Sequence, residues 1–171
     1  MEKGYVHVYT GTGKGKTTAA LGLALRAVCA DKKVYFAQFV KGMEYSELKA
    51  GDLLRNLKIC QYGRDCFIIK DPTNEDKKIA REGLTEIKNI LREGKYDIVI
   101  LDEINIALYY KLFDVYEVID ILKQRKEHVE VVLTGRNAPK ELIEFADLVT
   151  DMKGIKHYYE KGVQARIGIE K

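Results

Sequence analysis

Cysteine and histidine are scarce in this chain, and their spacing argues against several kinds of site. Cys29, Cys60 and Cys66 are odd in number and show no C-x-x-C spacing, so neither a disulfide framework nor a zinc knuckle is expected. The three histidines are scattered and lack the close pairing of a histidine metal site on one helix face. The sequence therefore implies no transition metal and favours reduced thiols in the cytosol.

An excess of charge of one sign is also missing. The chain has 29 Lys and Arg against 26 Asp and Glu, for a formal net charge of +3, which gives no broad electrostatic case for a nucleic-acid partner. No apolar run approaches membrane-spanning length, and the first residues lack the features of a signal peptide. We therefore predict a cytoplasmic protein with neither nucleic acid nor membrane as a partner.

The sequence also contains no recognisable linker and no internal repeat. No tract rich in Pro, Gly or Ser divides the 171 residues. Hydrophobic residues make up 46% and charged residues 32%, which is the balance of a globular protein with a sizeable core. The sequence predicts a single domain over residues 1–171.

Short runs rich in β-branched and aromatic residues alternate with longer segments of helical periodicity. This alternation is typical of an α/β fold with a mostly parallel central sheet and helices on both faces. The predicted strands cover residues 5–9, 34–40, 57–61, 98–101 and 129–133, with short closing strands at 148–152 and 164–169.

Helices are predicted between these strands. Residues 74–93 predict a long helix, residues 115–122 mark another, and Pro139 suits the first turn of a third. The aperiodic stretch 62–73 predicts a long loop at the edge of the site. After the first strand, apolar positions at helical spacing predict a helix with these residues on its inner face: Leu21, Ala24, Leu25 and Val28.

A glycine-rich segment joins the first predicted strand to this helix. It reads Thr10-Gly-Thr-Gly-Lys-Gly-Lys-Thr-Thr and matches the phosphate-binding loop G-x-x-x-x-G-K-[ST], except that threonine takes the place of the first glycine. Glycines allow backbone angles that turn successive N–H groups inward, and the helix N-terminus adds positive potential. The residues expected to bind the nucleotide are Gly11, Thr12, Gly13, Lys14, Gly15, Lys16, Thr17 and Thr18.

Two residues of this loop have expected chemical roles. Lys16 would neutralise phosphate oxygens, and the hydroxyl of Thr17 would coordinate magnesium, or manganese in its place. The motif between a strand and a helix predicts a P-loop NTPase fold of the RecA-like type. The alternative is a glycine-rich turn that holds no ligand.

Two carboxylates follow the buried run at 98–101. Asp102 and Glu103 would end a strand beside the strand of the phosphate loop, where carboxylates can reach a magnesium ion. The predicted metal ligands are thus Thr17, Asp102 and Glu103. The predicted catalytic residues are Lys16, Thr17 and Glu103. A helix N-cap is the alternative role of Asp102.

A further buried strand ends in a polar turn that contains Thr134 and Arg136. Ligands of open α/β sheets bind at the carboxyl ends of the strands, so both residues are candidates for the site, Arg136 as a ligand-binding residue. A simple strand-to-turn transition is the alternative. The phosphate loop alone does not separate kinases, switches, motors and transferases, although a guanine-binding Asn-Lys-x-Asp signature is missing.

Several further blocks of sequence resemble one family, the ATP:corrinoid adenosyltransferases of bacterial cobalamin synthesis and salvage. The likeness spans nearly the whole chain. The blocks are Thr10 to Gly22, Gln38-Phe-Val-Lys-Gly, Leu101-Asp-Glu with Asn105 and Ala107, Leu133-Thr-Gly-Arg-Asn-Ala-Pro, Ala146-Asp-Leu-Val-Thr with Met152, Lys156-His157, and Gln164 with Gly168-Ile-Glu.

This resemblance implies a reaction in which Co(I) of a reduced corrinoid attacks the 5′ carbon of ATP and releases tripolyphosphate. It implies that ATP and the corrinoid are substrates, and that ATP lies in the phosphate loop in a reversed sense, with the ribose carbon exposed. Phe67 lies where the family places aromatic side chains against the corrinoid, although packing of its loop on the core is an equal alternative. A flavoprotein reductant and a homodimer are implied as candidate partners.

Two other functions remain open at this level. One is a P-loop small-molecule kinase or ATPase that cleaves the β–γ bond. The other is a nucleotide-dependent binding protein without chemistry.

Overall fold

The computed structural model describes residues 2–65 and 71–171 of the chain. Its centre is a six-stranded sheet in the order β3-β2-β4-β5-β1-β6, in which every neighbouring pair is parallel. The strands are β1 (Val6–Thr10), β2 (Val34–Phe39), β3 (Leu57–Tyr62), β4 (Ile98–Asp102), β5 (Glu130–Thr134) and β6 (Leu148–Asp151). The parallel α/β architecture predicted from the sequence is confirmed.

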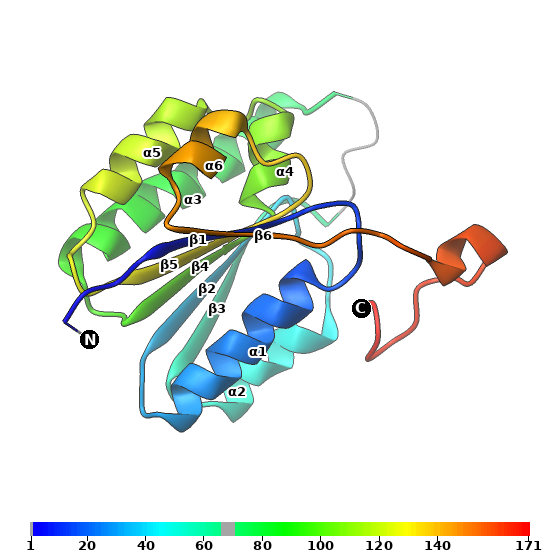
Figure 1. Cartoon of the computed structure of the whole chain (residues 1–171), viewed down its shortest axis with the longest axis horizontal. Helices are drawn as coiled ribbons and strands as arrows, with labels where there is room; N and C mark the ends of the chain where they lie inside the picture. The colour runs from blue at the N-terminus through cyan, green and yellow to red at the C-terminus, as the bar shows by residue number, and fades with distance from the viewer. Residues whose placement is uncertain (1, 66–70) are drawn as a thin grey trace.

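Helices cover both faces of this sheet (Figure 1). One face carries α1 (Lys16–Cys29), a 3-10 turn (Ser46–Lys49) and α2 (Ala50–Leu53). The other face carries α3 (Asn74–Glu93), α4 (Ile104–Tyr109), α5 (Val115–Lys123) and α6 (Lys140–Phe145). β2 and β4 are buried along their whole length because both of their faces are covered.

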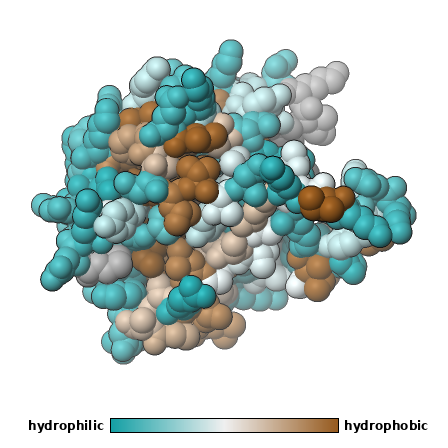
Figure 2. All heavy atoms as spheres, viewed as in Figure 1, coloured by the Kyte–Doolittle hydropathy of each residue, from teal (hydrophilic) through white to brown (hydrophobic). Residues whose placement is uncertain are grey.

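The edge strand β6 is less well covered than the strands in the middle. All four of its residues are exposed, including Leu148 and Val149. Figure 2 shows apolar surface over this part of the molecule. The predicted strand at 164–169 is wrong, since this segment forms turns. Gly162 and Gly168 have positive φ angles of 81° and 77°, and such turns prevent an extended strand.

The inner face predicted for α1 is also wrong in part. The buried stripe of α1 is Lys16, Ala20, Ala24 and Ala27, whereas the side chain of Leu25 is half exposed. The phosphate loop turns Lys16 inward and so fixes the rotation of the helix about its axis. The small alanines on the buried stripe then let the helix lie close to the sheet.

The strand β5 separates the phosphate-loop strand β1 from β4, so Asp102 does not end a strand directly beside β1. The phosphate loop and Asp102 nevertheless lie close together, because α1 starts after the end of β1 and contacts both β4 and β5. Sequence patterning predicts strands well but carries little information on their order.

A bidentate ion pair anchors the start of α3. Thr73 and Asp76 form a capping box, and Asp76 also accepts hydrogen bonds of 2.7 and 3.1 Å from Arg64. Burial alone would raise the pKa of Asp76, but the hydrogen bonds from Arg64 and Thr73 outweigh it and hold the pKa below its ordinary value. The pair ties the segment after β3 to the long helix.

We expect Asp76→Ala to lower the free energy of unfolding by about 2–4 kcal/mol, because it removes a helix cap together with a buried carboxylate that accepts two charge-assisted hydrogen bonds. The matched control is Glu75→Ala, whose carboxylate is exposed and 4.0 Å from Arg64; its cost should stay below about 0.5 kcal/mol. Urea unfolding measures both. The contribution of Asp76 should be complete above about pH 4, the unfolded pKa, and be lost as the pH falls through the lowered folded pKa.

Candidate functional site

The phosphate loop lies between β1 and α1 and is held against the segment that follows β6. Gly11 and Gly15 have φ angles of 102° and 118°, a region that side chains other than glycine rarely adopt. The N–H of Gly13 donates to the carbonyl of Met152 at 2.6 Å. A Cβ on Gly13 would lie 2.7 Å from that same oxygen, so this close approach requires glycine.

Lys16 is buried at the centre of the loop. Its Nζ donates to the carbonyl of Gly11 at 2.8 Å and to that of Gly13 at 2.7 Å. Burial lowers the pKa of Lys16, and the neighbouring carboxylates of Glu103 and Asp102 oppose this effect. The ammonium group therefore lies inside the concave side of the loop.

Asp102 is the centre of a cluster of polar side chains. It is completely buried at the end of β4. Its Oδ1 accepts hydrogen bonds from Thr17 at 2.8 Å and from Thr134 at 2.6 Å. The cluster thus joins the phosphate loop to the ends of β4 and β5, as the rule for the carboxyl ends of parallel strands predicts.

Glu103 follows Asp102 at a bend in the backbone. Its φ of 58° is left-handed, and it occupies the N-cap position of α4, so the alternative of Asp102 as the N-cap is wrong. The N–H of Glu103 donates to the hydroxyl of Thr134 at 3.0 Å. Burial raises the pKa of Glu103, and the negative charge of Asp102 raises it further. A cation near both carboxylates would relieve this repulsion.

Two residues at the end of β2 belong to the cluster and were given no role by sequence reasoning. The Nζ of Lys41 donates to Asp102 Oδ2 at 2.8 Å and lies 3.5 Å from the hydroxyl of Thr17. The amide of Gln38 lies 3.5 Å from the same carboxylate oxygen. Burial alone would lower the pKa of Lys41, but Asp102 raises it above its ordinary value. A polar residue in the otherwise apolar strand β2 was the signal that could have identified Gln38, whereas Lys41 lies after the end of the strand and had no such signal.

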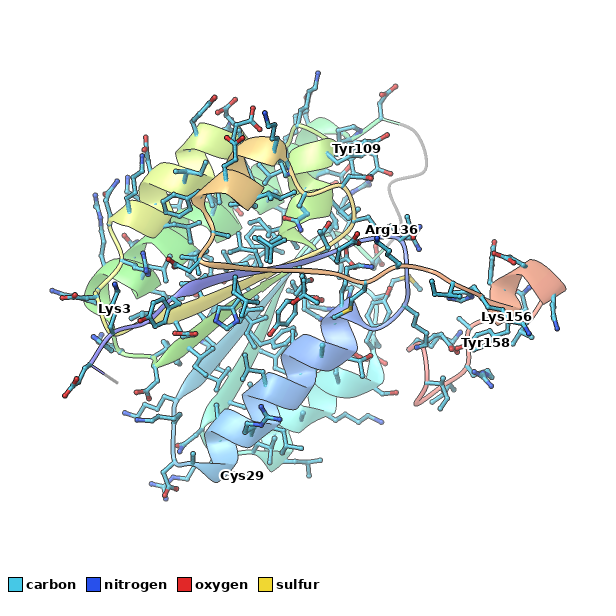
Figure 3. The ribbon with its side chains drawn as sticks, viewed as in Figure 1. Lys3, Cys29, Tyr109, Arg136, Lys156 and Tyr158 are labelled. Carbon is cyan, nitrogen blue, oxygen red and sulfur yellow. The ribbon has the colours of Figure 1, made fainter. Side chains whose placement is uncertain are left out.

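The other predicted residues lie around this centre. Arg136 is exposed, and Figure 3 shows it at the carboxyl edge of the sheet near the start of α1. Its charge acts on both Lys16 and Glu103. Thr18 is exposed on α1. The hydroxyl of Thr12 accepts a hydrogen bond from Gly154 at 3.2 Å. Phe67 lies outside the described residues.

The C-terminal segment reaches back to the phosphate loop. Lys14 donates to the carbonyl of Ile169 at 2.9 Å and lies 3.6 Å from the carboxylate of Glu170. The hydroxyl of Ser46 donates to the carbonyl of Lys171 at 3.0 Å. Tyr158, on the same segment, lies beyond the edge of the sheet in Figure 3. The predicted loop residue Lys14 is thus held by the chain's own C-terminus.

The donor atoms of the cluster fit a magnesium ion. Within residues 2–65 and 71–171, no group of three His, Cys, Asp or Glu residues could form a complete metal cage. Magnesium is commonly bound by one or two carboxylates, with waters and phosphates completing its shell. Thr17, Asp102 and Glu103 provide such a partial set of oxygen ligands.

Comparison with known proteins gives a consistent result over the whole chain. The model of the family "ATP:corrinoid adenosyltransferase BtuR/CobO/CobP" matches residues 2–170. A corrinoid adenosyltransferase from a Sinorhizobium species is 40% identical, over 99% of this chain and 81% of the relative. Those from Escherichia coli K12 and Salmonella typhimurium are 36% and 32% identical, each over 99% of this chain and 86% of the relative.

Proposed function

This chain belongs to the ATP:corrinoid adenosyltransferase family, and we propose that its phosphate loop holds ATP with the 5′ carbon, not the γ-phosphate, facing the second substrate. The enzyme transfers an adenosyl group from ATP to a corrinoid. In the proposed step, the electron pair of Co(I) forms a bond to C5′ as the C5′–O bond breaks. That oxygen leaves as part of tripolyphosphate, and the cobalt is formally oxidised to Co(III).

The structural observation that supports triphosphate binding is the arrangement of positive charge around the phosphate loop, and the attack at C5′ is proposed because the chain belongs to the adenosyltransferase family. Lys16 is buried inside the loop, Lys41 lies beside Asp102, and Arg136 is close enough to act on Lys16. All three can lie near a triphosphate. Negative charge develops on the leaving triphosphate, and preorganised donors that stabilise it are the largest single contribution in many enzymes.

Magnesium would be held by Thr17, Asp102 and Glu103 and would supply further stabilisation of the triphosphate charge. Lys16 would pair with phosphate oxygens in place of the carbonyls of Gly11 and Gly13. Because Co(I) is already a strong nucleophile, the attack requires no general base. Alignment of two bound reactants can contribute roughly 7–11 kcal/mol in favourable cases, so binding and orientation are the main tasks of this site.

Product analysis tests the proposal against its alternatives. The protein is incubated with ATP, Mg2+ and chemically reduced cobalamin, and phosphorus NMR and visible spectra are recorded. We expect tripolyphosphate and a light-sensitive cobalt–carbon species in equal amounts. ADP with phosphate would indicate cleavage of the β–γ bond by a kinase or ATPase, and unchanged ATP would indicate a nucleotide-dependent binding protein.

The remaining expectations concern partners and location. A flavoprotein reductant and a homodimer stay predictions, as do a role in adenosylcobalamin synthesis or salvage and a cytoplasmic location. The exposed apolar residues of β6 are a surface on which a second copy could pack. In the part of the chain that the structure describes, no helix combines the length and the apolar character needed to span a membrane.

A further inference from the structure

The carboxylate of Asp102 is surrounded by four hydrogen-bond donors. Oδ1 accepts from the hydroxyls of Thr17 and Thr134, and Oδ2 accepts from Lys41 with the amide of Gln38 at 3.5 Å. An ionised carboxylate offers about four lone-pair positions. A metal ion can therefore reach Asp102 directly only if one of these donors moves away.

Of the four donors, Lys41 is the one placed to move. Thr17 and Thr134 have short side chains on α1 and β5. Gln38 is completely buried and also bonds to Glu47 at 3.0 Å and to Gln61 at 3.1 Å. Lys41 carries its ammonium on a flexible four-carbon stem, and 14% of its side chain is exposed.

The backbone of Lys41, in contrast, is closely packed. A Cβ on Gly63 would lie 2.5 Å from the backbone nitrogen of Lys41, so the two chain segments approach as closely as glycine allows. The preceding residue, Val40, has a left-handed φ of 51°. With the backbone held in place, rotation about the bonds of the lysine stem is enough to move the ammonium away from Asp102.

We propose that Lys41 is a positioning residue that occupies the metal's place at Asp102 in the nucleotide-free protein and is displaced when the metal arrives together with ATP. Two positive groups cannot both bind Asp102 Oδ2, because an ammonium at 2.8 Å and a divalent cation repel each other at such short range. Lys41 keeps its contact with Asp102 when the metal has only Thr17, Asp102 and Glu103 as ligands. The metal displaces Lys41 when triphosphate oxygens add to its coordination shell.

Because Lys41 and the metal compete for Asp102, the enzyme binds the metal together with the nucleotide rather than before it. It rests on the proposed metal site at Thr17 and Asp102. Glu103 and Glu47 both attract the ammonium of Lys41 electrostatically, so the displaced group stays near negative charge. Bare metal, which would otherwise sit beside the two carboxylates, is kept out of the empty site.

The test measures the binding of Mn2+ alone to the nucleotide-free protein. Binding is monitored as the loss of the EPR signal of free aqueous Mn2+. We expect Lys41→Met to bind Mn2+ at least about tenfold more tightly than the unsubstituted protein, a coupling of ordinary size for two competing ligands. A substitution that merely damaged the site would lower the affinity for Mn2+. The expected increase in affinity therefore separates the proposed role of Lys41 from a structural defect.

Two control variants accompany this measurement. Lys41→Arg keeps the positive charge and should bind Mn2+ as weakly as the parent protein. Lys58→Met removes an exposed lysine on β3 that lies over the ring of Tyr35 and should leave Mn2+ binding unchanged.

Equal Mn2+ affinity of Lys41→Met and the parent protein, with both carrying Mn2+ through gel filtration in buffer that contains Mn2+ and ATP, would overturn the role of Lys41 and leave the metal site intact. If neither protein carries Mn2+ through the same gel filtration, the metal site itself is overturned and the inference with it.

Discussion

Lys16→Ala is expected to lower kcat/KM for adenosyl transfer by about 10²- to 10³-fold, the loss typical of removing one preorganised donor to developing negative charge. Lys16 is buried, and its Nζ already lies inside the loop on the carbonyls of Gly11 and Gly13. The variant loses this charge where the triphosphate would lie. Steady-state rates with ATP and reduced cobalamin measure the effect.

The neighbouring lysine provides a matched control for this variant. Lys14 belongs to the same loop but is exposed and points to the C-terminal segment, where it bonds to Ile169 and Glu170. Lys14→Ala should therefore lose much less activity than Lys16→Ala. Thermal unfolding should show both variants folded. Transfer by Lys16→Ala at the parent rate would mean that the loop does not hold the triphosphate through this residue.

Asp102→Asn is expected to reduce transfer at least about 100-fold and to raise the Mg2+ concentration required for half-maximal rate by about 10- to 100-fold. The amide oxygen can still accept hydrogen bonds from Thr17 and Thr134. The substitution removes the negative charge, however, and leaves Lys41 without its carboxylate partner. The proposed metal site would then lack one charged ligand while its shape is retained.

The same substitution at the opposite end of β4 is the control. Asp97 precedes the strand and accepts a hydrogen bond of 2.9 Å from the N–H of Lys33, far from the phosphate loop. Asp97→Asn keeps an acceptor for that bond and should leave the Mg2+ dependence unchanged. An Asp102→Asn enzyme with the parent rate and the parent Mg2+ dependence would exclude Asp102 as a metal ligand.

The centre of the site could be predicted from the sequence because it depends on local chain order. A strand, a glycine-rich loop and a helix follow one another, so Lys16 and Thr17 must lie at the first turn of α1. Asp102 ends a strand that is apolar throughout, and parallel strands present their carboxyl ends at one edge of the sheet. These two facts place Thr17 and Asp102 at the same edge of the sheet, and the packing of α1 against β4 and β5 brings them into contact.

Other features depend on contacts between distant segments, and the sequence did not predict them. The leucines of α1 compete with its alanines as an apolar stripe, and only the inward turn of Lys16 decides between the two. Lys41 looks like an ordinary loop lysine until β2 is placed next to β4. The segment 164–169 has alternating apolar residues typical of a strand, but Gly168 has a positive φ that bends the backbone.

The position of bond cleavage in ATP tests the central claim most directly. ATP labelled with 18O at the oxygen between C5′ and the α-phosphorus is used as the substrate with reduced cobalamin, and the isotope shift in the phosphorus spectrum of the products is measured. If the loop presents the 5′ carbon for attack, all of the label will be found on a terminal phosphorus of tripolyphosphate. Label retained on the nucleoside, or tripolyphosphate without label, would contradict this account.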